Sequence, residues 1–143
     1  MAKNTSTRQK LEQGRAAFAF ERATEGYTFH KTEYAPAVKK VPMMIKTNGL
    51  GATLAFMFSK QKMYATILKD IELWVNNTDN MKTKAIYDKA KGNSLVQKVT
   101  ELDSSEYRTL TIEVLAFLNW LRRFAEGIEK TNDPKNKNNK NEA

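Results

Sequence analysis

Apolar residues recur at helical spacing most clearly in the last third of the chain. Leu110, Val114, Phe117, Leu121, Phe124 and Ile128 follow one another at spacings of four, three, four, three and four. This spacing places all six on one face of an α-helix. Asp103 or Ser104 can cap that helix, and Glu106 stands near the position where a capping box needs an acidic side chain. The pattern therefore predicts a long final helix that forms the spine of the core.

The rest of the chain predicts further helices. Sustained alternation of apolar and polar residues is absent, and helix formers dominate the apolar segments. The expected helices cover residues 6–26, 31–47, 52–60 and 61–76, with a short helix around 95–99. Residues 81–94 have few apolar anchors, which predicts a loop or a weakly held helix. We expect an all-α fold: one compact helical domain of about five to six helices over residues 1–129.

Glycine and proline positions predict where these helices end or bend. Gly26 offers a left-handed cap to the first helix, and Pro42 should kink or interrupt the second because it has no N–H to donate. Gly49 and Gly51 could form a phosphate-binding loop, but Leu54 stands where a third glycine is expected and no Gly-Lys-Ser/Thr follows. A turn with close helix packing is the favoured interpretation of this pair.

The first helix has two separate apolar stripes. One contains Leu11 and Phe18 together with Arg15, and the other contains Phe20 and Tyr27. Two apolar faces need two partners. One partner is the domain core, and the other is either a second core helix or a neighbouring subunit.

Charge changes this picture more than overall composition does. The 143 residues include 24 Lys and Arg against 16 Asp and Glu, a formal net charge of +8. The excess is concentrated in residues 27–62, which hold six lysines and one glutamate. A face carrying these lysines would attract phosphate, although a solvated lysine-rich surface has the same composition.

The residue inventory excludes several kinds of site. The chain has no Cys and only one His, so thiolate chemistry, Cys-ligated zinc and multi-histidine metal centres are impossible. His30 is expected to be an ordinary loop residue. A metal-dependent nuclease would have to use carboxylates, for which Asp103, Glu106 and Glu113 are the candidate set. Asp70 and Glu72 make a weaker pair, because residues two apart do not share a helix face.

The ends of the chain carry no recognisable targeting segment. The N-terminal residues lack the apolar core of a secretory signal, and no stretch approaches the length of a membrane span. We therefore expect a soluble, cytoplasmic protein with no membrane partner. Residues 130–143 are rich in Asn and Lys and lack apolar residues able to dock, so they are expected to be a disordered tail.

Three sequence blocks carry a family resemblance. Residues 11–19 (LEQGRAAFA), 39–51 (KKVPMMIKTNGLG) and 106–125 (EYRTLTIEVLAFLNWLRRFA) resemble the small subunit of the type III-B CRISPR effector, the fifth subunit of the Cmr complex. The resemblance extends over roughly residues 10–127, is weakest across 76–100, and leaves the tail unmatched.

The resemblance implies a function that composition alone does not show. Proteins of this family are small, all-helical and without catalytic activity or a cofactor of their own. Several copies stack head to tail beside the backbone subunits that hold the guide RNA, and target RNA runs between the two rows. The implied partners are therefore other Cmr subunits, further copies of the same chain, and the guide and target RNA. The cutting carboxylate belongs to the backbone subunit.

Six basic residues are the candidates for contact with RNA. Lys39, Lys40 and Lys46 lie in the basic segment, and their charge suits a phosphate backbone. Arg15, Arg122 and Arg123 are further candidates, since a guanidinium can bind phosphate through two N–H groups. These three arginines have an equal alternative, which is ion pairing with Glu12, Glu113 or Glu126.

Two other functions remain open from the residues alone. One is the carboxylate-dependent nuclease, and the other is a free-standing helical adaptor that binds nucleic acid without companions. Trp120 lies in a run that is apolar almost all round, which favours a core or subunit contact over a base-stacking platform.

Overall fold

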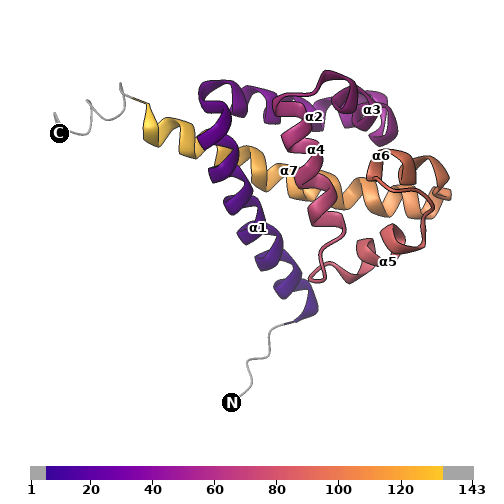
Figure 1. Cartoon of the computed structure of the whole chain (residues 1–143). Helices are drawn as coiled ribbons and strands as arrows, with labels where there is room; N and C mark the ends of the chain where they lie inside the picture. Colours follow the sequence, from indigo (N-terminus) through magenta and orange to yellow (C-terminus); the bar gives the residue numbers. More distant parts are fainter. Residues whose placement is uncertain (1–5, 134–143) are drawn as a thin grey trace, which may run out of the picture.

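The computed structural model describes residues 6–133, which are mostly helical and include no strand (Figure 1). The α-helices of this range are α1 (Thr7–His30), α2 (Tyr34–Asn48), α3 (Leu50–Lys60), α4 (Met63–Val75), α5 (Met81–Lys89), α6 (Leu95–Lys98) and α7 (Ser104–Asn132). Short 3₁₀ turns, Lys31–Glu33 and Val99–Glu101, precede α2 and follow α6. The all-α prediction is confirmed. The short helix expected around residues 95–99 is α6, and the additional α-helix of the described range is α5, in the segment left open as a loop or a weak helix.

Helix α7 is the spine of the fold, as its apolar pattern predicts. It crosses the whole molecule in Figure 1 and packs against α1, α2, α4 and α5. The Glu106 backbone N–H donates to Asp103 Oδ1 at 2.8 Å, and the Asp103 N–H donates to Glu106 Oε1 at 3.3 Å. The predicted capping box is therefore formed, with Asp103 as the cap. The first four residues of the predicted stripe are fully buried, and the last two pack at the edge of the core.

Helix α1 continues four residues beyond Gly26, where the sequence predicts its end. A Cβ at Gly26 would lie 2.2 Å from the ring of Tyr34, and that ring is completely buried. The missing side chain therefore allows α1 to approach the start of α2 closely, and it does not serve as a cap. Lys31 ends the helix instead, with a φ of 53° and its N–H donated to the carbonyl of Tyr27.

Helix α2 is a single helix that includes Pro42, so the predicted alternative of an interruption is wrong. It begins at Tyr34 and not at Lys31, because residues 31–33 form the separate 3₁₀ turn. Burial of one face can offset the hydrogen bond that proline cannot make. The buried residues of α2 are Tyr34, Ala35, Ala37, Val38, Val41 and Ile45.

The Gly49–Gly51 pair forms a tight turn between two packed helices, as the favoured interpretation predicts. Gly49 has a φ of 89°, a conformation that glycine adopts without strain. The backbone N–H of Gly51 donates to the hydroxyl of Tyr107 at 2.8 Å. A Cβ at either glycine would come within 3.5 Å of that oxygen. The start of α3, at Leu50 and not at residue 52, is thus fixed against α7.

Helix α5 forms in the segment where the sequence leaves a loop or a weak helix open. Glu72 Oε2 of α4 accepts hydrogen bonds from the Tyr87 hydroxyl at 2.6 Å and from the Leu95 N–H at 2.8 Å. The buried Lys98 donates to the carbonyls of Tyr87 and Ala90, both at 2.8 Å. These contacts tie α5 and α6 to each other and to α4.

The C-terminal helix extends past residue 129, the boundary expected from composition. It reaches Asn132, and the Thr131 hydroxyl donates back to the carbonyl of Gly127 at 2.9 Å. The first three residues of the expected tail are therefore helical. Residues 134–143, on which the rest of that expectation falls, lie outside the described range. Within the described range, no helix is both long and apolar enough to cross a membrane.

A buried ion pair joins α1 to α4. Arg22 Nε donates to Asp70 Oδ1 at 2.8 Å, and the Asp70 side chain is only 1% exposed. Burial raises the pKa of Asp70 to about 6, although the neighbouring charge of Arg22 lowers it. Glu25 raises the same pKa slightly and Lys69 lowers it. The folded chain therefore binds a proton at Asp70 more tightly than an unfolded chain does.

This shift predicts a pH-dependent stability. Because the folded pKa lies above the unfolded value of 3.8, stability associated with Asp70 is fully present below pH 4 and is lost as pH rises to about 6. Asp70→Asn keeps an acceptor for Arg22 and removes the titration. The free energy of unfolding of Asp70→Asn, relative to the unchanged chain, should rise by roughly 2–3 kcal/mol between pH 4 and pH 7 in urea titrations. A difference that stays constant over this range would contradict the assignment.

Candidate nucleic-acid interface

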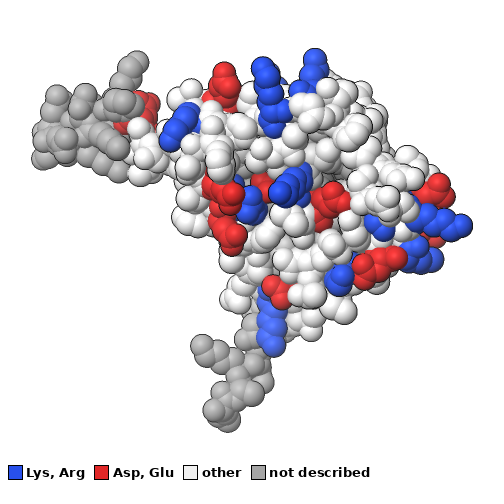
Figure 2. Space-filling view, viewed as in Figure 1, with Lys and Arg blue, Asp and Glu red and all other residues white. Residues whose placement is uncertain are grey.

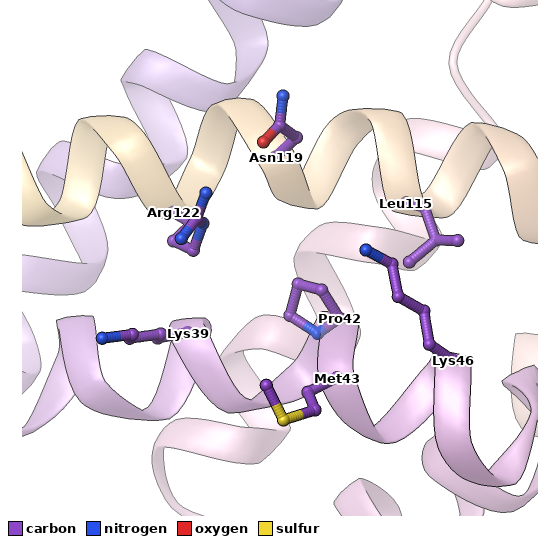
Figure 3. A pocket seen from close by; sticks show the side chains of 7 residues that line it. All are labelled: Lys39, Pro42, Met43, Lys46, Leu115, Asn119 and Arg122. Carbon is purple, nitrogen blue, oxygen red and sulfur yellow. The ribbon is translucent and has the colours of Figure 1, made fainter.

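A groove between α2 and α7 brings together three of the six predicted RNA-contacting residues (Figure 3). Lys39 and Lys46 come from α2, and Arg122 comes from α7. The groove has a volume of about 310 Å³. Its complete lining is Lys39, Pro42, Met43, Lys46, Leu115, Asn119 and Arg122.

Helical spacing explains why these residues meet. Lys39 and Lys46 are seven positions apart, two turns of helix, and so lie on the same exposed side of α2. Leu115, Asn119 and Arg122 follow the same rule on α7, at spacings of four and three. The packing of α2 against α7 then sets the two rows opposite each other. The groove thus forms between two amphipathic helices, with two lysines on the α2 side and one arginine on the α7 side.

The groove is electrostatically one-sided. None of its seven lining residues is acidic. The ion pairs formed among residues 6–133 also include none of Lys39, Lys46 and Arg122. Their positive charges are therefore not neutralised by neighbouring carboxylates and create a potential that favours an anionic occupant.

The basic excess is not spread evenly over the molecule. On the face shown in Figure 2, blue and red side chains lie next to each other, especially around α5 and α6. Two ion pairs belong to this region: Lys84 with Asp88 at 3.3 Å, and Lys89 with Glu106 at 3.2 Å. The lysines around α5 and α6 are thus paired with carboxylates, whereas the lining of the α2–α7 groove contains no carboxylate.

The other three predicted residues lie outside the groove lining. Lys40 and Arg123 are exposed on α2 and α7, each next in sequence to a groove residue. Arg15 is mostly buried and donates through Nε and Nη2 to the two carboxylate oxygens of Glu113, both at 2.8 Å. Of the alternatives left open by the sequence, ion pairing with Glu113 is confirmed for Arg15.

Sequence reasoning missed the uncharged part of the groove. The sequence pattern does not predict four lining residues, which are Pro42, Met43, Leu115 and Asn119. Apolar residues on amphipathic helices usually belong to the core, and a single uncharged amide carries no charge signal. The missing signal is the shared helix face: Met43 stands between Lys39 and Lys46, and Leu115 is seven residues before Arg122. Which two helices lie opposite each other is decided by tertiary packing.

The carboxylates of the nuclease alternative have structural partners. Asp103 and Glu106 form the cap of α7, and Glu106 also pairs with Lys89. Glu113 accepts hydrogen bonds from Arg15 and from the indole N–H of Trp74. Residues 6–133 contain no group of three or more His, Asp or Glu side chains close enough to hold a metal ion.

His30 and the weaker acid pair are also engaged. His30 is the last residue of α1, not a loop residue, and its Nε2 lies 2.9 Å from Thr66 Oγ1. Its ring stacks on Tyr34 at a centroid distance of 6.2 Å. Asp70 pairs with Arg22, and Glu72 accepts the bonds that hold α5 and α6.

Comparison with known proteins identifies the family. The family model of the CRISPR-associated protein Cas_Cmr5 matches residues 11–128. The chain belongs to the Cmr5 family. A crystal structure of a CRISPR-associated Cmr5 family protein from Thermus thermophilus is similar, with 25% sequence identity over 82% of this chain and 95% of that chain, and a TM-score of 0.65.

Membership in the Cmr5 family confirms the resemblance found in the sequence. It makes the chain a small structural subunit of a type III-B CRISPR complex, the Cmr complex, whose partners are the other Cmr subunits. The matched range includes α2 and nearly all of α1 and α7, so it contains the whole α2–α7 groove.

Proposed function

We propose that this Cmr5 subunit is non-catalytic and holds RNA in the assembled Cmr complex through the α2–α7 groove. The observation that carries the proposal is the convergence of Lys39, Lys46 and Arg122 on one groove that contains no carboxylate. Lys40 and Arg123 are exposed and adjacent in sequence to groove residues, but they do not line the groove. Arg15 is not part of the proposed contact, because Glu113 already binds its guanidinium.

The expected contact is with the sugar-phosphate backbone. Lysine ammonium groups act as mobile point charges, and an arginine can bind two phosphate oxygens at once. Such contacts carry no sequence information directly. The guide RNA would select the target by base pairing, and this subunit would bind any target strand in the same way.

A second surface supports the proposal that further copies pack beside this subunit. Phe20 of α1 is exposed and meets Phe124 of α7 edge-on at 5.2 Å, and Phe124 stacks on Trp120 at 5.6 Å. These rings form a partly exposed aromatic ridge along α1 and α7. Aromatic side chains are enriched in protein interfaces, so the ridge is a suitable contact for a neighbouring subunit.

The salt dependence of RNA binding tests the groove. For a single strand, log K falls against log salt with a slope of about −0.7 per neutralised phosphate. Replacing both Lys39 and Lys46 with Ala should therefore make the slope shallower by about 1.4. The measurement is a titration of target RNA with the assembled Cmr complex at several salt concentrations.

Lys82→Ala is a control for the loss of a positive charge outside the groove. Lys82 is exposed in the first turn of α5 and is not part of the groove. Its removal takes away one positive charge and should leave the slope unchanged. An unchanged slope for the Lys39/Lys46 double variant would remove the groove from the RNA-contacting surface.

A further inference from the structure

Three of the residues that line the α2–α7 groove are apolar, namely Pro42, Met43 and Leu115, and they are here called its floor. Pro42 and Met43 lie between Lys39 and Lys46 along α2, with the Pro42 ring toward α7 and the Met43 side chain on the outer side of α2 (Figure 3). Leu115 comes from α7. Met43 is 70% exposed, although it is a large apolar side chain. Phosphate contacts alone require cations and do not require an apolar floor. The floor therefore calls for an occupant with an apolar surface of its own.

We infer that the groove binds one unstacked base of a single-stranded RNA, with phosphates on either side of that base. This inference rests on the proposed function and adds a base site to its phosphate contacts. Lys39 and Lys46 are separated by two helical turns, about 10 Å along the axis. A strand that follows α2 can place a phosphate near each lysine and the intervening base on Met43.

The groove chemistry fits a base of any identity. Methionine is flexible and polarisable, and its sulfur makes favourable contacts with aromatic rings. Asn119 lines the α7 side of the groove, and its amide group can both donate and accept hydrogen bonds. One flexible thioether and one amide do not discriminate strongly between bases. The site should therefore favour unpaired over paired RNA without a sequence preference.

Charge decides between RNA and the other possible occupant of an apolar groove. An apolar side chain of a neighbouring Cmr subunit could also rest on Met43 and Leu115. It would leave Lys39, Lys46 and Arg122 beside an uncharged surface, with their ammonium and guanidinium groups partly desolvated and unpaired. A nucleotide supplies both the ring for the floor and the negative charge for the rim.

Methionine-methyl NMR of the full chain tests this inference directly. The chain has six methionines, and ¹³C labelling of their methyl groups reports on each one. The probes are a short oligoadenylate and an abasic oligomer with the same number of phosphates. The oligoadenylate should shift the Met43 methyl upfield through the ring current of the bound base, and the abasic oligomer should not. Met81, which is 69% exposed on α5, is the matched control and should not move.

Binding of the two probes gives a second readout. Met43→Ser should weaken oligoadenylate binding about fivefold and leave binding of the abasic oligomer unchanged. Met81→Ser should change neither. Equal Met43 shifts and equal affinities for both oligomers would overturn the base site and leave the phosphate contact standing. If neither oligomer binds or shifts a groove resonance, the base site fails, whereas RNA contact by the assembled complex is decided separately by the salt titration of the Lys39/Lys46 variant.

Discussion

Replacing Glu113 with Ala should lower the free energy of unfolding by about 3–5 kcal/mol, among the largest losses that a single change in this chain can cause. Glu113 is buried on α7 and accepts three hydrogen bonds, two from Arg15 of α1 and one from Trp74 of α4, all at 2.8 Å. Its removal leaves a mostly buried guanidinium without its counterion and a buried indole N–H without an acceptor. Urea unfolding followed by circular dichroism measures the loss.

Two further variants serve as controls: one removes only the charge of Glu113, and the other removes an exposed carboxylate. Glu113→Gln keeps an acceptor for Trp74 and loses the charge that neutralises Arg15, so its destabilisation should lie between zero and that of the alanine variant. Glu12→Ala removes an exposed carboxylate from α1 and should change the free energy of unfolding by less than about 0.5 kcal/mol. Equal stabilities for Glu12→Ala and Glu113→Ala would contradict the assigned network.

Replacing Gly26 with Ala should destabilise the fold by about 3 kcal/mol or more, although alanine is the better helix former. The added Cβ would lie 2.2 and 2.3 Å from two ring carbons of Tyr34. That ring is fully buried, so it cannot rotate into solvent to make room. The helices α1 and α2 would have to separate, and core packing would be lost with them.

Gly127→Ala is the matched control for the effect of the backbone. Gly127 lies inside α7, is exposed, and would meet nothing within 4 Å through a new Cβ. The same substitution there should raise the free energy of unfolding by about 0.5–1 kcal/mol. Chemical unfolding of the two variants should thus give shifts of opposite sign. Stabilisation at both positions would show that Gly26 is not a packing glycine.

Elements whose signals are local could be predicted from the sequence. The capping box of α7 and the spacing of its apolar stripe lie within single stretches of chain, and both are confirmed. The end of α1 could not be predicted in the same way. A glycine at position 26 is typical of a helix C-terminus. Only the position of Tyr34, which tertiary packing brings next to Gly26, shows that this glycine allows α1 to pack closely against α2.

The candidate site also contains residues that the sequence predicts and residues whose placement depends on tertiary packing. The basic segment of the sequence points to Lys39 and Lys46, and the structure brings both to one groove. Two other features depend on which helices pack together. Arg122 lines the groove because α7 packs against α2. Arg15 pairs with Glu113, 98 positions away in the sequence, because α1 packs against α7. Charge pattern alone left both arginines with two equal interpretations.

A cryo-electron microscopy map of the assembled Cmr complex with bound target RNA would show whether this subunit contacts the strand. We expect the α2–α7 groove to face the RNA, with density for phosphates beside Lys39, Lys46 and Arg122. A map in which this groove opens to bulk solvent, or is filled by a protein side chain from a neighbouring subunit, would contradict this expectation.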